Sequence, residues 1–153
     1  MSDDGARHSG RCFCGAVRFT AKGQPLWVAH CHCHSCRRST GAPVTTFVGF
    51  PSDAFAYDQG APAVFESSPG VRRKFCARCG TPLSYEADGA PGEIHLYIST
   101  LDEPEAFPPG LHVFYEESIG WLQLDDDIPY YAKTSIGTQP LSAEDRVALR
   151  PKP

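Results

Sequence analysis

Short apolar runs separated by glycine and proline dominate the chain. Residues 93–100 (EIHLYIST) alternate cleanly, with Ile94 and Leu96 on one side and His95 and Tyr97 on the other. This alternation is typical of a half-buried strand. Similar but less regular patterns predict strands or extended segments at residues 10–21, 27–34, 44–50, 72–75, 83–86, 111–115 and 120–124. The pattern therefore favours a mainly β fold built from short strands.

Helical signals are few and short. We expect a turn or helix at residues 35–40 and one helical turn at residues 52–57, with Ser52 as its N-cap. Ser142 and Asp145 have the spacing of an N-terminal cap near the end of the chain. The predicted organisation is a flexible tail at residues 1–9, one zinc-binding domain at residues 10–137, and a tail or short docked helix at residues 138–153.

Length and charge limit the class of protein. The 153 residues suit one hydrophobic core, and the net charge of −4 disfavours binding to nucleic acid. The first nine residues are polar, and no apolar run is long enough for a signal peptide or a membrane span. We therefore expect a cytoplasmic protein without a membrane partner, in which disulfides are not the main use of cysteine.

Seven cysteines fall into three groups. Cys76 and Cys79 form a C-x-x-C turn followed by glycine, and Cys12 and Cys14 form a C-x-C pair. Both spacings direct two sulfurs to one centre, so the four cysteines predict a closed tetrahedral zinc site of the structural type. Free buried thiols, disulfides or a redox-active pair are the alternatives.

The third group, Cys31, Cys33 and Cys36, provides three thiolates and no fourth cysteine. Catalytic zinc sites keep one position open, so we interpret this group as a second, catalytic zinc site. His30, His32 and His34 alternate with these cysteines and would face the other way in an extended segment. A histidine or carboxylate that closes the second site is the alternative interpretation.

Other polar residues are candidates for substrate contacts or for surface positions. Arg37 and Arg38 adjoin Cys36, and Arg73 with Lys74 adjoins the C-x-x-C turn, so these basic side chains are candidates for holding a substrate carboxylate. His32 is a further candidate for a substrate contact. We expect His95 and His112 to be surface or internally satisfied histidines, and residues 125–127 (DDD) to be a solvated acidic turn.

The cysteine pattern resembles that of the glutathione-dependent formaldehyde-activating enzyme family, which also contains centromere protein V-like members. The resemblance runs from about Gly10 to Tyr131. It rests on residues 10–15 (GRCFCG), 31–37 (CHCHSCR) and 73–83 (RKFCARCGTPL), followed by residues 99–102 (STLD), 109–112, Trp121 and residues 125–129.

The resemblance implies a β-tent fold of stacked small antiparallel sheets. It also implies structural zinc at Cys12, Cys14, Cys76 and Cys79, and catalytic zinc at Cys31, Cys33 and Cys36. The family's nominal reaction joins glutathione and formaldehyde into S-(hydroxymethyl)glutathione, which is a carbon–sulfur lyase reaction run in reverse.

We expect a thiol such as glutathione to take the open position of the second site. A zinc ion that is bound by three soft thiolates suits another soft sulfur ligand better than water. The expected partners are therefore a glutathione-type thiol and a small aldehyde. A zinc-stabilised binding module without catalysis, for a thiol ligand or a protein partner, is the main alternative. A thiol redox enzyme that uses Cys31 to Cys36 is a third possibility.

Overall fold

The structure is a computed structural model that describes residues 5–150. In this range the chain forms ten strands, two α-helices and four 3₁₀ helices, which confirms the mainly β prediction. The strands are β1 (Arg7–Arg11), β2 (Arg18–Lys22), β3 (Trp27–Cys31), β4 (Thr45–Pro51), β5 (Phe55–Gln59), β6 (Ala63–Ser68), β7 (Val71–Phe75), β8 (Pro82–Ala87), β9 (Glu93–Tyr97) and β10 (Leu111–Val113). The helices are α1 (His34–Thr40), α2 (Ala143–Leu149), η1 (Ser52–Ala54), η2 (Ile98–Thr100), η3 (Pro104–Ala106) and η4 (Tyr115–Glu117).

The chain divides into two compact units that share the sequence in alternating segments. Unit 1 takes the residues up to Trp27 together with Phe47–Pro108, and unit 2 takes Val28–Thr46 together with the residues from Pro109 on. Both units include parts of residues 10–137, for which the sequence predicts one domain. Neither helix in the described part of the chain has the length or the apolar character that a membrane crossing requires.

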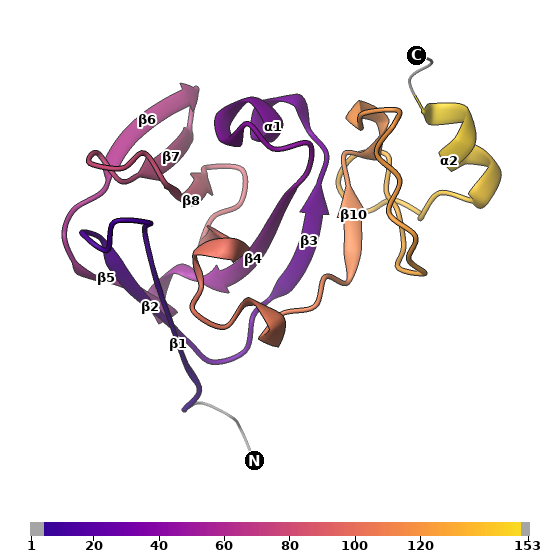
Figure 1. The fold of residues 1–153 in the computed structure, drawn as a ribbon. Helices are drawn as coiled ribbons and strands as arrows, with labels where there is room; N and C mark the ends of the chain where they lie inside the picture. The colour runs from indigo at the N-terminus through magenta and orange to yellow at the C-terminus, as the bar shows by residue number, and fades with distance from the viewer. Residues whose placement is uncertain (1–4, 151–153) are drawn as a thin grey trace. The chain divides into compact units, whose positions relative to one another are not determined.

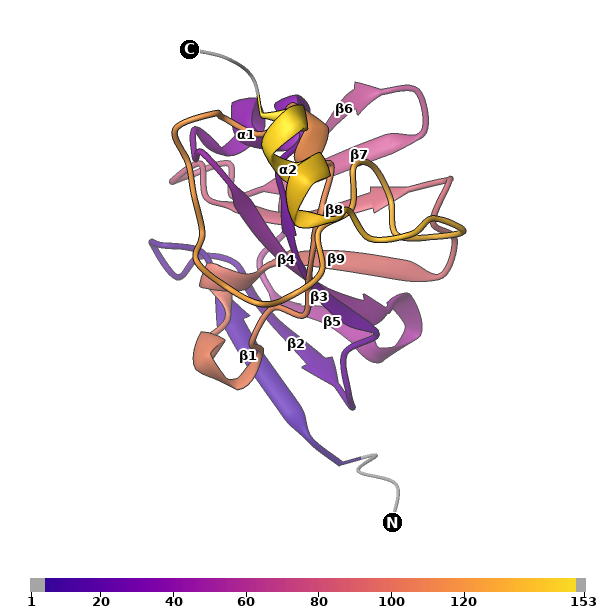
Figure 2. The same cartoon turned by 90° about the vertical axis from the view of Figure 1, so that its right-hand side faces the viewer.

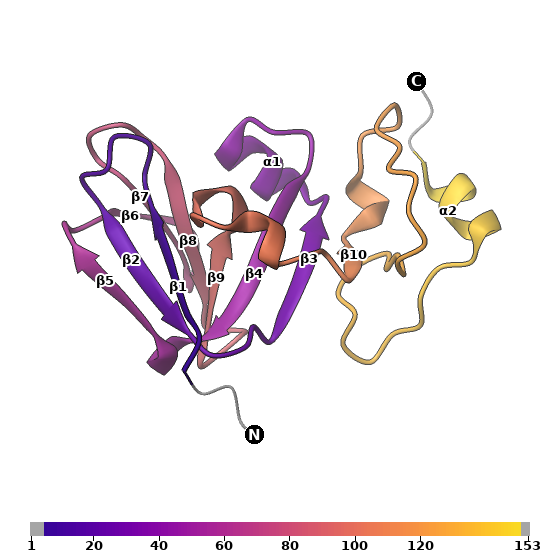
Figure 3. The ribbon, with the colours of Figure 1, turned by 60° about the horizontal axis from the view of Figure 1, so that its bottom comes forward.

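Unit 1 contains two sets of antiparallel strands. Strands β1, β2 and β5 lie side by side in this order (Figure 3). Strands β9, β8, β7 and β6 follow one another in a second sheet (Figure 2), where β9 also pairs with β4 from Phe47 onward. Strands β7 and β8, which the sequence predicts on either side of the C-x-x-C turn, pair as an antiparallel hairpin.

Large apolar side chains fill the interior of unit 1. Phe19, Phe50, Leu83 and Leu96 are almost fully buried, and each contributes roughly 1.5–3 kcal/mol through removal from water. The hydroxyls of Tyr57 on β5 and Ser84 on β8 lie 2.7 Å apart, so a hydrogen bond joins the two sheets in the core. This core supports the loops that carry the cysteines of unit 1.

Unit 2 is built around the parallel pair of β3 and β10, which lie side by side in Figure 1. The pairing register places His112 directly beside His30. Helix α1 follows β3, and helix α2 is attached through two arginines, with the Arg146 guanidinium 4.4 Å from the Tyr130 ring centre and Arg150 Nε donating to the Tyr115 hydroxyl.

Several local predictions differ from the structure. Residues 120–124 form no strand, because the Leu122 N–H donates to the Ile119 carbonyl in a turn and is not available to a neighbouring strand. The single strand predicted at residues 10–21 is divided into β1 and β2 by a turn that the Gly15 N–H closes on the Cys12 carbonyl. Strand β1 begins at Arg7, inside the predicted tail, while residues 1–4 lie outside the described range.

Helix α1 (His34–Thr40) confirms the helical segment predicted at residues 35–40, whereas the segment predicted at residues 52–57 is shorter than expected. Residues 52–54 form a 3₁₀ turn, but the Ser52 side chain makes no capping hydrogen bond there. By contrast, Ser142 Oγ accepts from the Asp145 backbone N–H at the start of α2, as its spacing predicts.

Candidate metal centres

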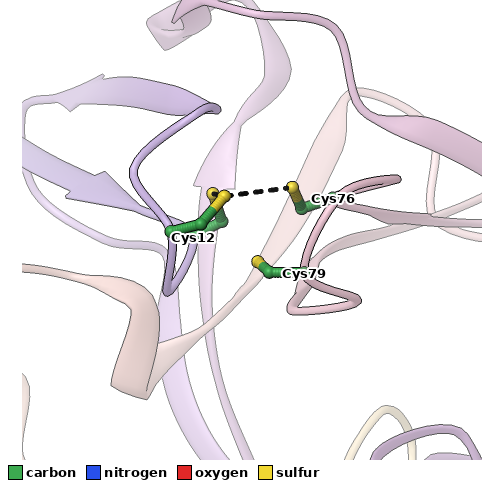
Figure 4. Close-up of side chains that lie close together, drawn as sticks. Cys12, Cys76 and Cys79 are labelled. Atoms are coloured by element: carbon green, nitrogen blue, oxygen red, sulfur yellow. Dashed lines mark hydrogen bonds between the residues drawn. The ribbon is translucent and has the colours of Figure 1, made fainter.

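Four cysteines from two distant segments meet in unit 1. We call Cys12, Cys14, Cys76 and Cys79 the four-cysteine cluster; their sulfurs all lie within 4.8 Å of one another. Figure 4 shows Cys12, Cys76 and Cys79 turning their sulfurs toward a common point between two loops. The Sγ atoms of Cys12 and Cys14 are 3.6 Å apart, and those of Cys14 and Cys76 are 3.9 Å apart. Tetrahedral zinc with bonds of about 2.3 Å places sulfurs roughly 3.8 Å apart, so the geometry fits such an ion.

Two similar loops hold this cluster. In the first, the Gly15 N–H donates to the Cys12 carbonyl; in the second, the Gly80 N–H donates to the Cys76 carbonyl. Both glycines have positive φ, at 78° and 79°, a conformation that other residues adopt only with strain. The Val17 N–H donates to Cys12 Sγ at 3.3 Å, so the loop directs a backbone dipole at a sulfur.

The protonation of the four-cysteine cluster is uneven without a cation. The Thr81 hydroxyl and backbone hydrogen bonds lower the pKa of Cys79 to about 5. A backbone hydrogen bond at Ala16 lowers the pKa of Cys14, but burial and the sulfurs of Cys12 and Cys79 outweigh it and raise the pKa to about 11. Four crowded thiols cannot all ionise unless a positive charge compensates them, and a metal ion supplies that charge.

Three further cysteines meet in unit 2. Cys31, Cys33 and Cys36 form the three-cysteine cluster, in which all sulfurs again lie within 4.8 Å of one another. The Sγ atoms of Cys31 and Cys36 are 3.6 Å apart. Hydrogen bonds with Cys33 and Cys36, together with burial, strongly raise the pKa of Cys31, so full ionisation of this cluster also requires a nearby cation.

Helix α1 positions the three-cysteine cluster. Cys33 is the N-cap of the helix, and its Sγ accepts the Cys36 backbone N–H at 3.2 Å. The helix ends at Gly41, whose φ of 70° closes the C-terminus through a hydrogen bond to the Arg37 carbonyl. The short helix therefore brings Cys36 back toward Cys31 and Cys33.

Within residues 5–150, no histidine, aspartate, glutamate or fourth cysteine joins the three-cysteine cluster. The neighbouring histidines have other partners. His30 Nδ1 lies 2.7 Å from Thr46 Oγ1, His32 Nε2 lies 2.9 Å from His112 Nδ1, and His34 Nδ1 lies 2.9 Å from Glu117 Oε1. Three convergent thiols without a fourth such protein ligand are the donor set of an open metal site.

Sequence comparison places these clusters in a known context. The family profile described as "Glutathione-dependent formaldehyde-activating enzyme" matches residues 7–117, which is more than half of the chain. The chain belongs to this family.

Two individual similarities accompany this family membership. A Halomonas elongata protein named "Putative glutathione-dependent formaldehyde-activating enzyme" is 26% identical over 126 residues, which is 76% of this chain and 80% of that protein. A crystal structure of a Rhodobacter sphaeroides protein aligns with a TM-score of 0.53 at 23% identity, over 61% of this chain and 87% of the other. At this identity the second similarity supports the fold alone.

The basic residues proposed as substrate contacts occupy different environments in this family member. Arg37 donates to the backbone carbonyls of His32, at 3.2 Å, and Glu117, at 2.8 Å. Arg38 follows it on α1 and is exposed. In unit 1, Arg73 is only 7% exposed and donates to Ser67 Oγ and Tyr97 Oη. The substrate contacts of these arginines and of His32 stay predictions.

One grouping of side chains in unit 2 was not predicted from the sequence. His112 Nε2 lies 3.0 Å from a carboxylate oxygen of Asp126, although Asp126 belongs to the segment that was expected to be a solvated acidic turn. Its neighbours Asp125 and Asp127 are exposed, as that expectation requires. No local motif indicates the contact, because His112 and Asp126 meet through the folding of the loop between β10 and Tyr130.

Proposed function

We propose that this chain joins a glutathione-type thiol and a small aldehyde, with formaldehyde as the first candidate, into an S-(hydroxymethyl) adduct. This is the carbon–sulfur lyase reaction in the direction of synthesis. One observation carries the proposal: three cysteines converge in unit 2, and within the described residues no fourth cysteine, histidine or carboxylate completes their cluster. Membership of the family supports the same assignment.

The proposal places zinc at both cysteine clusters. The four-cysteine cluster has the complete ligand set of a structural site, which stabilises the two loops of unit 1. The three-cysteine cluster would hold a second ion with one position left for a soft ligand such as a thiolate. When bound, this ion supplies positive charge that favours the ionised form of a substrate thiol.

The chemical step needs no oxidant. The thiol loses its proton, its sulfur forms a bond to the carbonyl carbon, and the electron pair of the carbon–oxygen π bond moves to oxygen. The oxygen then takes up a proton, so the product is a neutral hemithioacetal. The chain's part in this step is to hold the two reactants together, which lowers the entropic cost of their encounter.

Arg38 is the best-placed candidate for recognising a carboxylate of the thiol. It is exposed on the helix that carries Cys36, whereas the adjacent Arg37 already donates to two backbone carbonyls. A guanidinium binds a carboxylate through two parallel hydrogen bonds. In this proposal Arg37 fixes the position of helix α1, and Arg38 contacts the ligand.

The decisive experiment combines metal content with thiol protection. We expect anaerobically purified protein to hold zinc at both cysteine clusters, and glutathione to protect only Cys31, Cys33 and Cys36 from alkylation. S-methylglutathione keeps the peptide skeleton but lacks the thiol, so it should protect none of them. The rate of adduct formation from glutathione and ¹³C-formaldehyde is then measured by NMR against the uncatalysed reaction.

Other results would overturn part of the proposal or favour a different function. Protection by glutathione without an increase in adduct rate would overturn catalysis and favour a zinc-stabilised module that binds a thiol. Equal protection by both compounds, or none by either, would overturn thiol binding at the three-cysteine cluster. Reversible disulfide formation among Cys31, Cys33 and Cys36 with loss of metal would favour a redox enzyme.

A further inference from the structure

Strand β3 carries cysteine and histidine side chains on opposite faces. Successive side chains of a strand alternate. Cys31 contacts Cys36, whereas His30 on its N-terminal side and His32 on its C-terminal side both approach His112 of β10. The histidine face of this segment is therefore separate from the three-cysteine cluster and has its own partners.

A carboxylate completes the group on the histidine face. We call His30, His112 and Asp126 the histidine–aspartate cluster; one ring nitrogen of each histidine and one carboxylate oxygen lie within 4.8 Å of one another. His112 is fully buried, and Asp126 is 28% exposed. The ring of Tyr130 stacks on His112, with centroids 3.8 Å apart and planes 9° apart, and so fixes the imidazole plane.

One ring nitrogen of each of the two histidines is held by a neighbour outside the cluster. His112 Nδ1 lies 2.9 Å from His32 Nε2, and His30 Nδ1 lies 2.7 Å from Thr46 Oγ1. Histidines that bind metals almost always donate their other N–H to such a partner, which fixes the tautomer and the ring orientation. When His112 Nδ1 carries the proton and donates to His32 Nε2, the lone pair of His112 Nε2 is available on the side of Asp126.

We propose that the histidine–aspartate cluster is a third metal site, which takes one divalent transition-metal ion such as Zn²⁺ or Fe²⁺ independently of the cysteine clusters. Two imidazoles and one carboxylate form a recognised ligand set for both ions and leave further positions for water. The ion would lie between His112 Nε2 and Asp126, in place of their hydrogen bond, and this ligation requires the single proton of the neutral His112 ring to be on Nδ1. The partly exposed Asp126 side chain marks the side from which the ion enters.

The test uses the full chain and a matched set of aspartate substitutions. Asp126→Asn keeps the size of the side chain but removes its charge. Asp125→Asn and Asp127→Asn make the same change at exposed neighbours outside the cluster. Each protein is dialysed to equilibrium against Zn²⁺, and separately against Fe²⁺ without oxygen, and the metal per chain is measured by mass spectrometry.

We expect Asp126→Asn to hold one ion fewer per chain than the wild type, while Asp125→Asn and Asp127→Asn match the wild type. Equal metal content in all four proteins would overturn the proposal. The number of alkylated cysteines, measured in the same samples, reports whether the cysteine clusters hold metal. This measurement distinguishes loss of metal from the cysteine clusters from loss of metal from the histidine–aspartate cluster. His30→Gln is the second variant and should show the same deficit.

Cobalt provides an independent readout. Co²⁺ bound by thiolates has intense sulfur-to-metal charge-transfer absorption, whereas Co²⁺ bound by nitrogen and oxygen has only weak d–d bands. We expect Asp126→Asn to lose a set of d–d bands and to keep the full charge-transfer absorption. A loss of charge-transfer absorption alone would show that the missing ion was bound by cysteine, and would overturn the proposal.

Discussion

The backbone N–H of Phe13 donates to the hydroxyl oxygen of Thr81 at 3.0 Å, across 68 residues of sequence. This hydrogen bond joins the two loops of the four-cysteine cluster. The same hydroxyl lies 3.1 Å from Cys79 Sγ and donates to that sulfur when it is ionised. Thr81 therefore holds one loop in place while it stabilises the charge on a metal-ligand candidate of the other.

Replacement of Thr81 by valine should weaken the four-cysteine cluster. Thr81→Val keeps the shape of the side chain but leaves the Phe13 N–H and Cys79 without their partner. We expect the affinity of the cluster for zinc, measured by competition with a chelator, to fall roughly 10–100-fold, because removal of groups that hydrogen-bond to metal ligands has effects of this size. Thr134→Val removes a comparable acceptor for the Ile136 N–H in unit 2 and should not change chelator resistance. Equal zinc loss from both variants would contradict this role.

Two cysteine-to-serine substitutions should separate structural from functional roles. Cys33→Ser removes a thiol but keeps an N-cap, because serine also accepts the Cys36 N–H. We expect it to abolish glutathione protection with little change in the melting temperature. Cys79→Ser should instead lower the melting temperature, because the four-cysteine cluster loses a ligand. Calorimetry and alkylation of both variants test this, and the reverse pattern would contradict the assignment of the two clusters.

The adjacent arginines of α1 should have separable effects. Arg38→Gln should raise the dissociation constant for glutathione by about 10-fold or more, as expected when a charge-assisted hydrogen bond of roughly 1.5–3 kcal/mol is lost, and leave stability unchanged. Arg37→Gln should lower stability, because Arg37 holds the carbonyls of His32 and Glu117. Isothermal titration and thermal unfolding measure both effects. Unchanged glutathione binding by Arg38→Gln would remove Arg38 from the proposal.

His95 should make unit 1 less stable in acid. Burial lowers the pKa of His95 below 6.5, although Glu93 opposes the shift. The unfolded chain therefore binds a proton on His95 near pH 6.5 while the native chain does not, so the free energy of unfolding falls as the pH drops below 6.5. His95→Phe keeps a ring against Trp27 and should reduce the loss of stability between about pH 7 and pH 5.

The control for this pH effect is Tyr85→Phe. Tyr85 stacks on His95, so the substitution alters the same packing but leaves the imidazole in place. Denaturant unfolding at several pH values should therefore give Tyr85→Phe the slope of the wild type. A His95→Phe slope equal to that of the wild type would contradict the assignment.

Gly10 should not tolerate a larger side chain. A Cβ at this position would lie 2.2 Å from the Phe19 ring and 2.6 Å from the Thr100 carbonyl oxygen. Because Phe19 is a buried core residue, we expect Gly10→Ala to destabilise the protein by roughly 1–3 kcal/mol. Gly89→Ala has nothing within 4 Å of the new atom and is the matched control for denaturant unfolding. Equal stability of the two variants would contradict this packing argument.

The local sequence was sufficient to predict structure where the conformation of a short segment depends on its own residues. The alternation of residues 93–100 predicted β9, although the last three residues form the 3₁₀ helix η2, and the residues beside Cys76 and Cys79 predicted β7 and β8. Spacing and glycine placement also predicted the cysteine groups, because both ligands of a C-x-C or C-x-x-C pair come from one loop. The same local information was misleading at residues 120–124, where the Leu122 N–H closes a turn on the Ile119 carbonyl and the segment forms no strand.

By itself, the sequence determined the mainly β class, the family and the cysteines that are able to share a metal, since these depend on residue type and short-range spacing. Only the tertiary structure decided which side chains from distant segments meet. It joined Phe13 to Thr81, and it assigned Arg37 to two backbone carbonyls. It also placed His30 beside His112 through the β3–β10 register and brought Asp126 to the same point. The physical reason is that such contacts depend on strand register and loop closure, which follow from packing of the whole unit and leave no fixed spacing in the chain.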